Sequence, residues 1–133
     1  MALQVYSAKK YSARLKATIQ GTGKLGFTAE TAKSLQLSPD SYIKIAYDGD
    51  QNDKLYLIVC NSPDDDGFKV SYVSKYYSLP TAVLFKELGI DYVNNTVMFD
   101  LVRFPALDEE ADGKVYRMDK RMNLKNKKEA NMR

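Results

Sequence analysis

The chain has 133 residues, and its 44% hydrophobic and 28% charged residues are ordinary proportions for a folded globular protein, which excludes wholesale disorder and indicates one compact domain. It contains no histidine, so the commonest general base and transition-metal ligand are missing, and most hydrolase and zinc chemistries are excluded. Its one cysteine, Cys60, cannot form an intrachain disulfide, and no signal-peptide pattern or apolar run of roughly 20 residues is present. We therefore expect a cytoplasmic protein with no membrane partner.

The net charge of +3 hides an uneven distribution along the chain. Residues 1–24 contain five Lys or Arg and no acid, and residues 114–133 contain eight Lys or Arg against two acids. The stretch from 25 to 113 is correspondingly acidic. Basic ends around an acidic middle indicate a polyanionic partner, although the same pattern is common in solubilising tails.

The first expected strand covers residues 14–20, where Leu15, Ala17 and Ile19 alternate with polar and basic residues. This alternation predicts a half-buried strand with a basic outer face. A Gly-Thr-Gly turn follows it. Residues 28–36 then predict a short helix that ends before a Ser-Pro-Asp sequence.

Two further strands are expected at residues 42–47 and 55–60, joined by a stretch rich in turn-forming residues, and together they predict a β-hairpin. Cys60 ends the second of these apolar strands, and we interpret it as a small core residue without a catalytic role. Residues 61–67, with Pro63 and three consecutive aspartates, predict an exposed connection between two halves of the chain.

The second half begins with a long strand, expected over residues 68–77. A helix should start near Pro80 and run to Leu88, and Gly89 stands where a left-handed C-terminal cap is favoured. Residues 96–104 predict another strand. Because both expected helices are short, the sheet should organise the core.

The two halves are related by a weak internal repeat with a period of about 53 residues. Lys33-Ser34-Leu35-Gln36-Leu37 aligns with Lys86-Glu87-Leu88-Gly89-Ile90, and Thr28-Ala29 aligns with Thr81-Ala82. We therefore predict an α+β fold in which two pseudo-repeated strand-helix-strand units form one mainly antiparallel, sheet-rich domain. The domain should cover residues 1–119, with units at about 13–60 and 67–118, and residues 120–133 should form a basic, mobile tail.

Three resemblances to known families follow from short sequence patterns. Lys24-Leu25-Gly26-Phe27-Thr28 before a short helix, with Tyr42-Ile43-Lys44-Ile45 after it, resembles the AbrB-like swapped-hairpin DNA-binding fold. The segment from Tyr76 to Val97 is similar to uncharacterised proteins from gut bacteria and their phages. The order of sheets and helices, with the basic and apolar alternation of residues 13–17, resembles the Whirly and positive-cofactor-4-like single-strand-binding regulators. The first and third resemblances imply DNA binding, an inference by fold analogy.

Lys and Arg next to Tyr predict a nucleic-acid surface, because the cations neutralise phosphates and aromatic rings stack on bases. Tyrosines in a β-rich chain can equally be half-buried sheet residues, so each tyrosine has a structural interpretation as well. We expect single-stranded DNA as the favoured partner and no cofactor. The predicted nucleic-acid-binding residues are Lys9, Lys10, Tyr11, Arg14, Lys16, Lys75, Tyr76, Tyr77, Tyr116, Arg117, Lys120 and Arg121.

The acidic and glycine-rich segments do not match the patterns of metal-binding or phosphate-binding loops. The stretch from Asp48 begins like a calcium-binding loop, but Asp53 and Val59 stand where Gly and Glu are required. Residues 108–113 predict a solvated hairpin turn, because no entering helix precedes them, and residues 64–66 predict a hydrated loop. The glycine-rich stretch Gly21-Thr22-Gly23-Lys24-Leu25-Gly26 does not match a phosphate-binding loop. We expect a non-enzymatic protein without metal ligands.

A second function class stays open from the sequence. The chain could be a non-catalytic assembly protein that forms homo-oligomers through exposed sheet edges, with the basic ends of one chain meeting the acidic middle of another. Neutralising the acidic loops at 64–66 and 108–112 should abolish such self-association and leave nucleic-acid binding intact.

Overall fold

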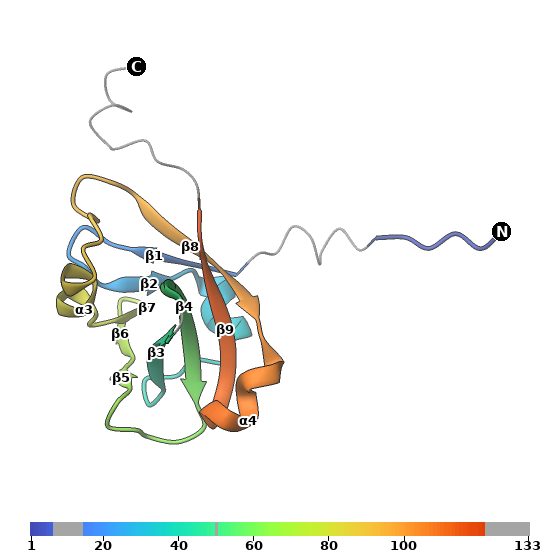
Figure 1. The fold of residues 1–133 in the computed structure, drawn as a ribbon. Coiled ribbons are helices and arrows are strands. Elements are labelled where there is room, and N and C mark those ends of the chain that lie inside the picture. The colour runs from blue at the N-terminus through green and yellow to red at the C-terminus, as the bar shows by residue number, and fades with distance from the viewer. Residues whose placement is uncertain (7–14, 50, 122–133) are drawn as a thin grey trace, which may run out of the picture.

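The computed structural model describes residues 1–6, 15–49 and 51–121, with the backbone only at 51–53, and shows a strand-rich fold with short helices (Figure 1). The elements in chain order are β1 (Lys16–Ile19), β2 (Leu25–Phe27), α2 (Ala29–Ser34), β3 (Tyr42–Asp48), β4 (Gln51–Cys60), β5 (Phe68–Lys69), β6 (Ser71–Val73), β7 (Tyr76–Leu79), α3 (Ala82–Glu87), β8 (Val97–Arg103), the 3-10 turn η1 (Pro105–Leu107), α4 (Asp108–Ala111) and β9 (Gly113–Lys120).

All of these strands belong to one antiparallel sheet that curls into a nearly closed barrel. The strand order is β5-β3-β4-β9-β8-β1-β2-β7-β6. The two strands at the ends of this order, β5 and β6, are neighbours in the sequence and are separated only by Val70. Val70 is buried, and its N–H donates to the Ser41 carbonyl at 2.9 Å. The chain therefore bends at Val70 and brings the two ends of the sheet together.

The core lies inside this curled sheet and between it and the helices. Alternate residues of each strand point inward, as the pleat requires. The helices lie at opposite ends of β2: α2 follows its last residue, whereas Thr81, the N-cap of α3, bonds to Leu25 at its start. They add Ala32, Leu35 and Phe85 to the core. The inward-facing strand residues include Ala17, Ile19, Leu25, Phe27, Ile43, Leu57, Leu79, Val97, Phe99, Leu101, Tyr116 and Met118.

The predicted fold class, an α+β domain of two strand-helix-strand units, was wrong. Strands from the two halves pair with each other: β1 with β8, β2 with β7, and β4 with β9. Neither half therefore has a sheet of its own. The described α-helices have six, six and four residues, too few to cover a sheet. Hydrophobic burial consequently depends on closing the sheet on itself.

The internal repeat is nevertheless visible at the two helix ends. The N–H of Leu37 donates to the carbonyl of Ala32, and that of Ile90 donates to the carbonyl of Phe85, fifty-three residues later. Gln36, with φ of 57°, occupies the place of Gly89, with φ of 73°. The repeat also relates the hairpins of the two halves. The β1–β2 pair corresponds to the β6–β7 pair, and the β3–β4 pair corresponds to the β8–β9 pair. Each half thus contributes two hairpins that are interleaved with those of the other half.

Other expectations had mixed outcomes. The strand in residues 14–20 and the hairpin of β3 and β4 are confirmed. The single long strand over residues 68–77 was wrong, because the chain bends at Val70 and reverses at Ser74 and Lys75. These two residues have φ values of 52° and 66°, which suit the two-residue turn of a β-hairpin.

Three more differences concern the end of the chain and the core. The acidic residues after η1 form the short helix α4 in the predicted hairpin turn. The strand β9, which the sequence pattern had not predicted, occupies the middle of the sheet order. Cys60 is only partly buried. Of the predicted tail, Lys120 ends β9, Arg121 follows it, and residues 122–133 lie outside the described part of the chain.

Among the described residues, no helix has the length and apolar character to cross a membrane.

Candidate nucleic-acid interface

The candidate interface is the outer face of four neighbouring strands, β1, β8, β9 and β4, together with the adjoining end of β9. Inward residues of β8 are apolar, so Asp100 points outward between Phe99 and Leu101. The strand register places Lys16 of β1 opposite Asp100 and places Asp119 of β9 opposite Asp100 on the other side. One row of charged residues therefore crosses three strands.

The two adjacent carboxylates of this row each have an arginine partner. Arg117 bonds to Asp119 through two hydrogen bonds, Nε to Oδ1 at 2.6 Å and Nη2 to Oδ2 at 2.8 Å. The hydrogen bond from Arg117 to Asp119 raises the pKa of the guanidinium. Arg121 Nε donates to Asp100 Oδ1 at 3.0 Å. The arginines thus neutralise two like charges that would otherwise repel each other across the sheet.

A groove beside this row holds two cations that lack a described acidic partner. Lys54 and Lys120 are both exposed, and neither makes an ion pair with another described residue. Lys120 is the last residue of β9, so it stands at the rim of the sheet. Their ammonium groups are therefore available to an external anion. The groove has a volume of about 370 Å³ and is lined by Lys54, Arg117, Met118, Asp119 and Lys120.

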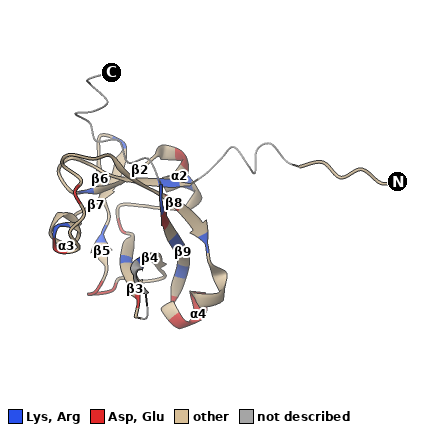
Figure 2. Cartoon of the chain, turned by 45° about the horizontal axis from the view of Figure 1, so that its top comes forward, with Lys and Arg blue, Asp and Glu red and all other residues tan. Residues whose placement is uncertain are grey.

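The charge balance of the whole face is positive. Five basic residues stand against only Asp100 and Asp119, which leaves an excess of three positive charges. Three other acidic residues of the same β8–β9 hairpin gather at its other end, in α4, as Figure 2 shows. We name this surface the basic face; its residues are Lys16, Lys54, Asp100, Arg117, Asp119, Lys120 and Arg121.

An aromatic ring lies next to the basic face. The register pairs Tyr56 of β4 with Arg117 of β9, so both side chains leave the sheet on its outer side. The ring of Tyr56 also contacts that of Phe104, with centroids 5.8 Å apart. Tyr56 is partly exposed and can offer the remaining part of its ring to a base.

Four of the predicted nucleic-acid-binding residues lie together on the basic face: Lys16, Arg117, Lys120 and Arg121. Tyr116 does not, because it points into the core and is only 5% exposed. Burial raises the pKa of its hydroxyl, and Arg103 lies 5.4 Å from its ring centroid. Tyr116 is therefore a packing residue. The predicted residues Lys9, Lys10, Tyr11 and Arg14 lie outside the described part of the chain.

The predicted residues Lys75, Tyr76 and Tyr77 belong to the β6–β7 hairpin. Tyr77 packs against the core and contacts the ring of Tyr72, with centroids 4.4 Å apart. Tyr76 lies over Gly26, where the nearest atom to an added Cβ would be its hydroxyl oxygen at 1.9 Å. Two strands, β2 and β1, separate this hairpin from β8 in the sheet. These three residues are thus separate from the groove at Lys54 and Lys120.

Sequence reasoning missed Lys54 and Tyr56. The signal was present, since Lys54, Tyr56 and Ile58 alternate with Leu55 and Leu57 in the manner of a half-buried strand. Their importance depends on β9 lying beside β4, which the sequence pattern had not predicted.

A mainly apolar cavity elsewhere on the sheet has no basic residue in its lining. It has a volume of about 380 Å³ and lies between the outer side of β3 and β4 and the connection formed by η1 and α4. Tyr56, Ile58, Leu107 and Ala111 are among its lining residues, with Glu110 as an acid. An acidic, mainly apolar cavity does not suit a polyanion.

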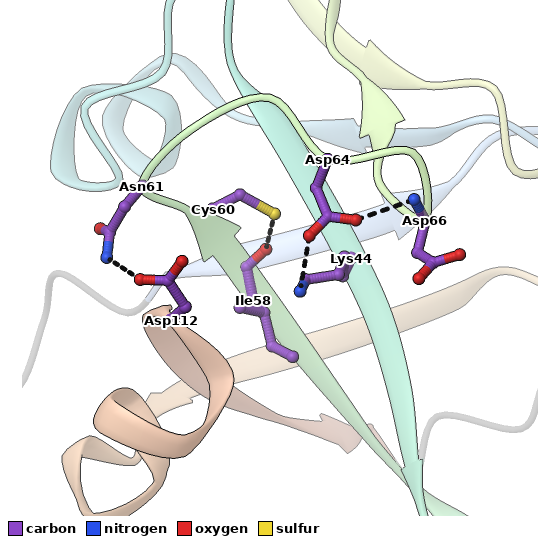
Figure 3. Close-up of polar contacts among 7 residues, drawn as sticks. All are labelled: Lys44, Ile58, Cys60, Asn61, Asp64, Asp66 and Asp112. Carbon is purple, nitrogen blue, oxygen red and sulfur yellow. Dashed lines mark hydrogen bonds and ion pairs between the residues drawn. The ribbon is translucent and has the colours of Figure 1, made fainter.

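The polar contacts near Cys60 connect loops to strands and to the end of α4 (Figure 3). Lys44 Nζ bonds to Asp64 Oδ2 at 3.1 Å, and the Asp66 N–H donates to Asp64 Oδ1 at 2.9 Å. These two bonds, with the Asp66 N–H the stronger cause, lower the pKa of Asp64. Burial raises the pKa of the Cys60 thiol, which disfavours the reactive thiolate.

The neighbouring Asn61 ties this loop to the end of α4, since its Nδ2 donates to Asp112 Oδ1 at 3.1 Å. In the described segments, no three His, Cys, Asp or Glu side chains lie close enough together to hold a metal ion. The aspartates at 64 and 112 thus hold loops in place.

Comparisons of the chain with protein-family models, with curated proteins and with solved structures found no match.

Proposed function

We propose that this protein binds nucleic acid without catalysis, with single-stranded DNA as the favoured partner, and that the basic face is the contact surface. The observation that carries this proposal is the groove in which Lys54 and Lys120 are exposed beside Arg117 and have no described acidic partner. Phosphate groups satisfy such cations and release bound counterions when they do so.

The adjacent tyrosine supports a single-stranded partner. Tyr56 lies one strand from Arg117 in the same row, so a phosphate at the groove leaves its base within reach of the ring. Stacking on one aromatic ring contributes about 1 to 3 kcal/mol to single-strand binding. Ion-paired Arg117 and Arg121 would hold their positions on the sheet before the nucleic acid arrives.

The interleaved hairpins also support the proposal. Each half of the chain supplies two hairpins that pair across the barrel with those of the other half. The sequence resemblance to the AbrB-like swapped-hairpin fold concerns the segment of these hairpins that contains β2, α2 and β3. The argument from fold to function is by analogy.

The experiment is a fluorescence-anisotropy titration of labelled single- and double-stranded oligonucleotides at two salt concentrations. The test variant is Lys54→Ala/Lys120→Ala. The control is Lys33→Ala/Lys69→Ala, which removes the same charge from exposed positions on α2 and β5. We expect micromolar or tighter binding that weakens with salt, and a salt slope that falls by roughly 0.7 for each single-strand phosphate that the test variant no longer neutralises. If the two variants bound the oligonucleotides with equal affinity, the basic face would not be the binding site.

An assembly function is the second candidate, and one observation favours it. Among the described strands, β5 covers the edge of β3 at only Tyr42 and Ile43, so these strands do not close the barrel fully. Unpaired strand edges favour association between chains.

A further inference from the structure

The open edge of β3 is a place where the described structure lacks a strand. β3 pairs along its length with β4, from Ile43 to Asp48. On its other side, the described partner is β5, which pairs only with Tyr42 and Ile43. The strand then bends at Val70 and leaves as β6, whose one described neighbour is β7. A gap in the described strand pairing, called the wedge, therefore lies between β3 and β6.

Backbone hydrogen-bonding groups point into this wedge. Ser41 accepts from the Val70 N–H on the side of β5. Because these groups alternate between the two sides of a strand, the N–H and C=O groups of Ile45 and Tyr47 point to the same side. Beyond Ile43, no described strand lies there to pair with them. The edge thus offers four backbone groups to an added strand.

The other half of the barrel shows what a fuller closure looks like. In the internal repeat, β8 corresponds to β3. On the side away from its hairpin partner β9, β8 pairs with β1. β1 pairs with β8 from Lys16 to Ile19, and the Leu101 N–H adds a bond to the Leu15 carbonyl. The β3 edge has two paired residues where the β8 edge has four. In the repeat β1 corresponds to β6, which pairs only with β7 among the described strands, so part of the β3 edge is left for an added strand.

One described segment has the pattern that such a strand requires. Met1, Leu3 and Val5 are apolar at alternating positions, with exposed fractions of 114%, 86% and 92%. Residues 1–5 form neither helix nor strand. If this segment lay beside β3 as a strand, its apolar face would be on the same side of the sheet as Ile45, which packs against the core. Its other face would lie on the outer side with Lys44 and Ala46.

We propose that residues 1–5 of one chain pair as a strand with the free edge of β3 in a second copy, and that the exchange is reciprocal. In the single chain the apolar side chains of this segment are exposed, and no described strand pairs with its own β3 edge beyond Ile43. A reciprocal exchange gives a closed two-fold dimer.

The test compares two variants that add the same charge to opposite faces of the segment. Leu3→Asp/Val5→Asp places charge on the apolar face, whereas Ala2→Asp/Gln4→Asp places it on the outer face. Light scattering after size exclusion should give twice the monomer mass of 15.1 kDa for the native chain and the outer-face variant. The apolar-face variant should have the monomer mass.

Hydrogen exchange locates the contact on the acceptor side. The amides of Ile45 and Tyr47 should exchange at least tenfold more slowly in the native protein than in Leu3→Asp/Val5→Asp, at a concentration where the native chain is dimeric. The proposal would be overturned if Leu3→Asp/Val5→Asp were still a dimer. It would also be overturned if the native chain were a monomer, whatever the exchange rates of the β3 amides. Nucleic-acid binding by the basic face is a separate property, so either proposal can fail alone.

Discussion

The hydroxyl of Thr81 accepts a hydrogen bond from the Leu25 N–H at 3.0 Å, although the two residues are 56 positions apart in the chain. The same hydroxyl donates to the Gly23 carbonyl at 3.0 Å. Both Thr81 and Leu25 have an exposed fraction of 0%. Thr81 is the N-cap of α3, so this pair ties the start of the second-half helix to β2 in the first half.

We expect Thr81→Val to lower the free energy of unfolding by about 1 to 3 kcal/mol, because it leaves the buried Leu25 N–H without its partner while conserving shape. Urea denaturation measures the change. Thr22→Val is the matched control, since Thr22 is exposed in the adjacent turn. A Thr81→Val protein as stable as the control would show that the hydroxyl does not hold α3 in place.

Gly113→Ala should also destabilise the fold. An added Cβ would lie 2.5 Å from the Val59 carbonyl oxygen and 2.9 Å from Ile58 Cγ2, at the start of the strand that pairs with β4. Overpacking of this kind costs about 1 to 3 kcal/mol. Gly21→Ala should cost much less, because nothing lies within 4 Å of the Cβ that it would add. Thermal unfolding of both variants decides whether the close approach of β4 and β9 requires glycine.

Stability should fall at acid pH through the loss of one carboxylate. Asp108 Oδ1 accepts from the Val115 N–H at 2.9 Å and from Arg103 Nη1 at 2.7 Å. Arg103 is the larger cause that lowers the pKa of Asp108 from 3.8 to about 2. Because the folded state has the lower pKa, the stabilisation is present above pH 3.8 and is lost as the pH falls toward about 2.

The measurement for this prediction is the urea midpoint across that pH window. Asp108→Asn should reduce the dependence on pH, whereas Asp65→Asn, at an exposed loop position, should leave it as in the native protein. An unchanged slope in Asp108→Asn would mean that other carboxylates dominate acid unfolding.

Asp119→Asn should strengthen nucleic-acid binding. The substitution replaces the carboxylate that accepts both hydrogen bonds of Arg117 with a neutral amide, which has one acceptor oxygen, and so raises the net charge of the basic face by one. One charge at about 4 Å in water contributes about 1 kcal/mol, or a factor of about five in affinity at low salt. Asp65→Asn makes the same charge change in the loop after β4 and should have little effect. If the two variants bind equally, net charge and not the basic face governs binding.

Local features of this protein followed from the sequence. The alternation of Ala17 and Ile19 with polar residues predicted β1, and apolar runs around turn formers predicted the β3–β4 hairpin. Gly89 was predicted to take a left-handed conformation, and its φ of 73° confirms this. These features depend on neighbours in the chain, so periodicity and single-residue preferences are enough to find them.

The tertiary structure decided which strands are neighbours and hence which charges meet. Arg117 and Lys120 were predicted as binding residues, but the place of both beside Lys54 depends on β9 lying against β4. Tyr116 follows a similar local pattern and yet points into the core. Pairing between distant strands is set by closure of one shared core. Periodicity within one strand identifies two faces, but the strand beside it determines what each face meets.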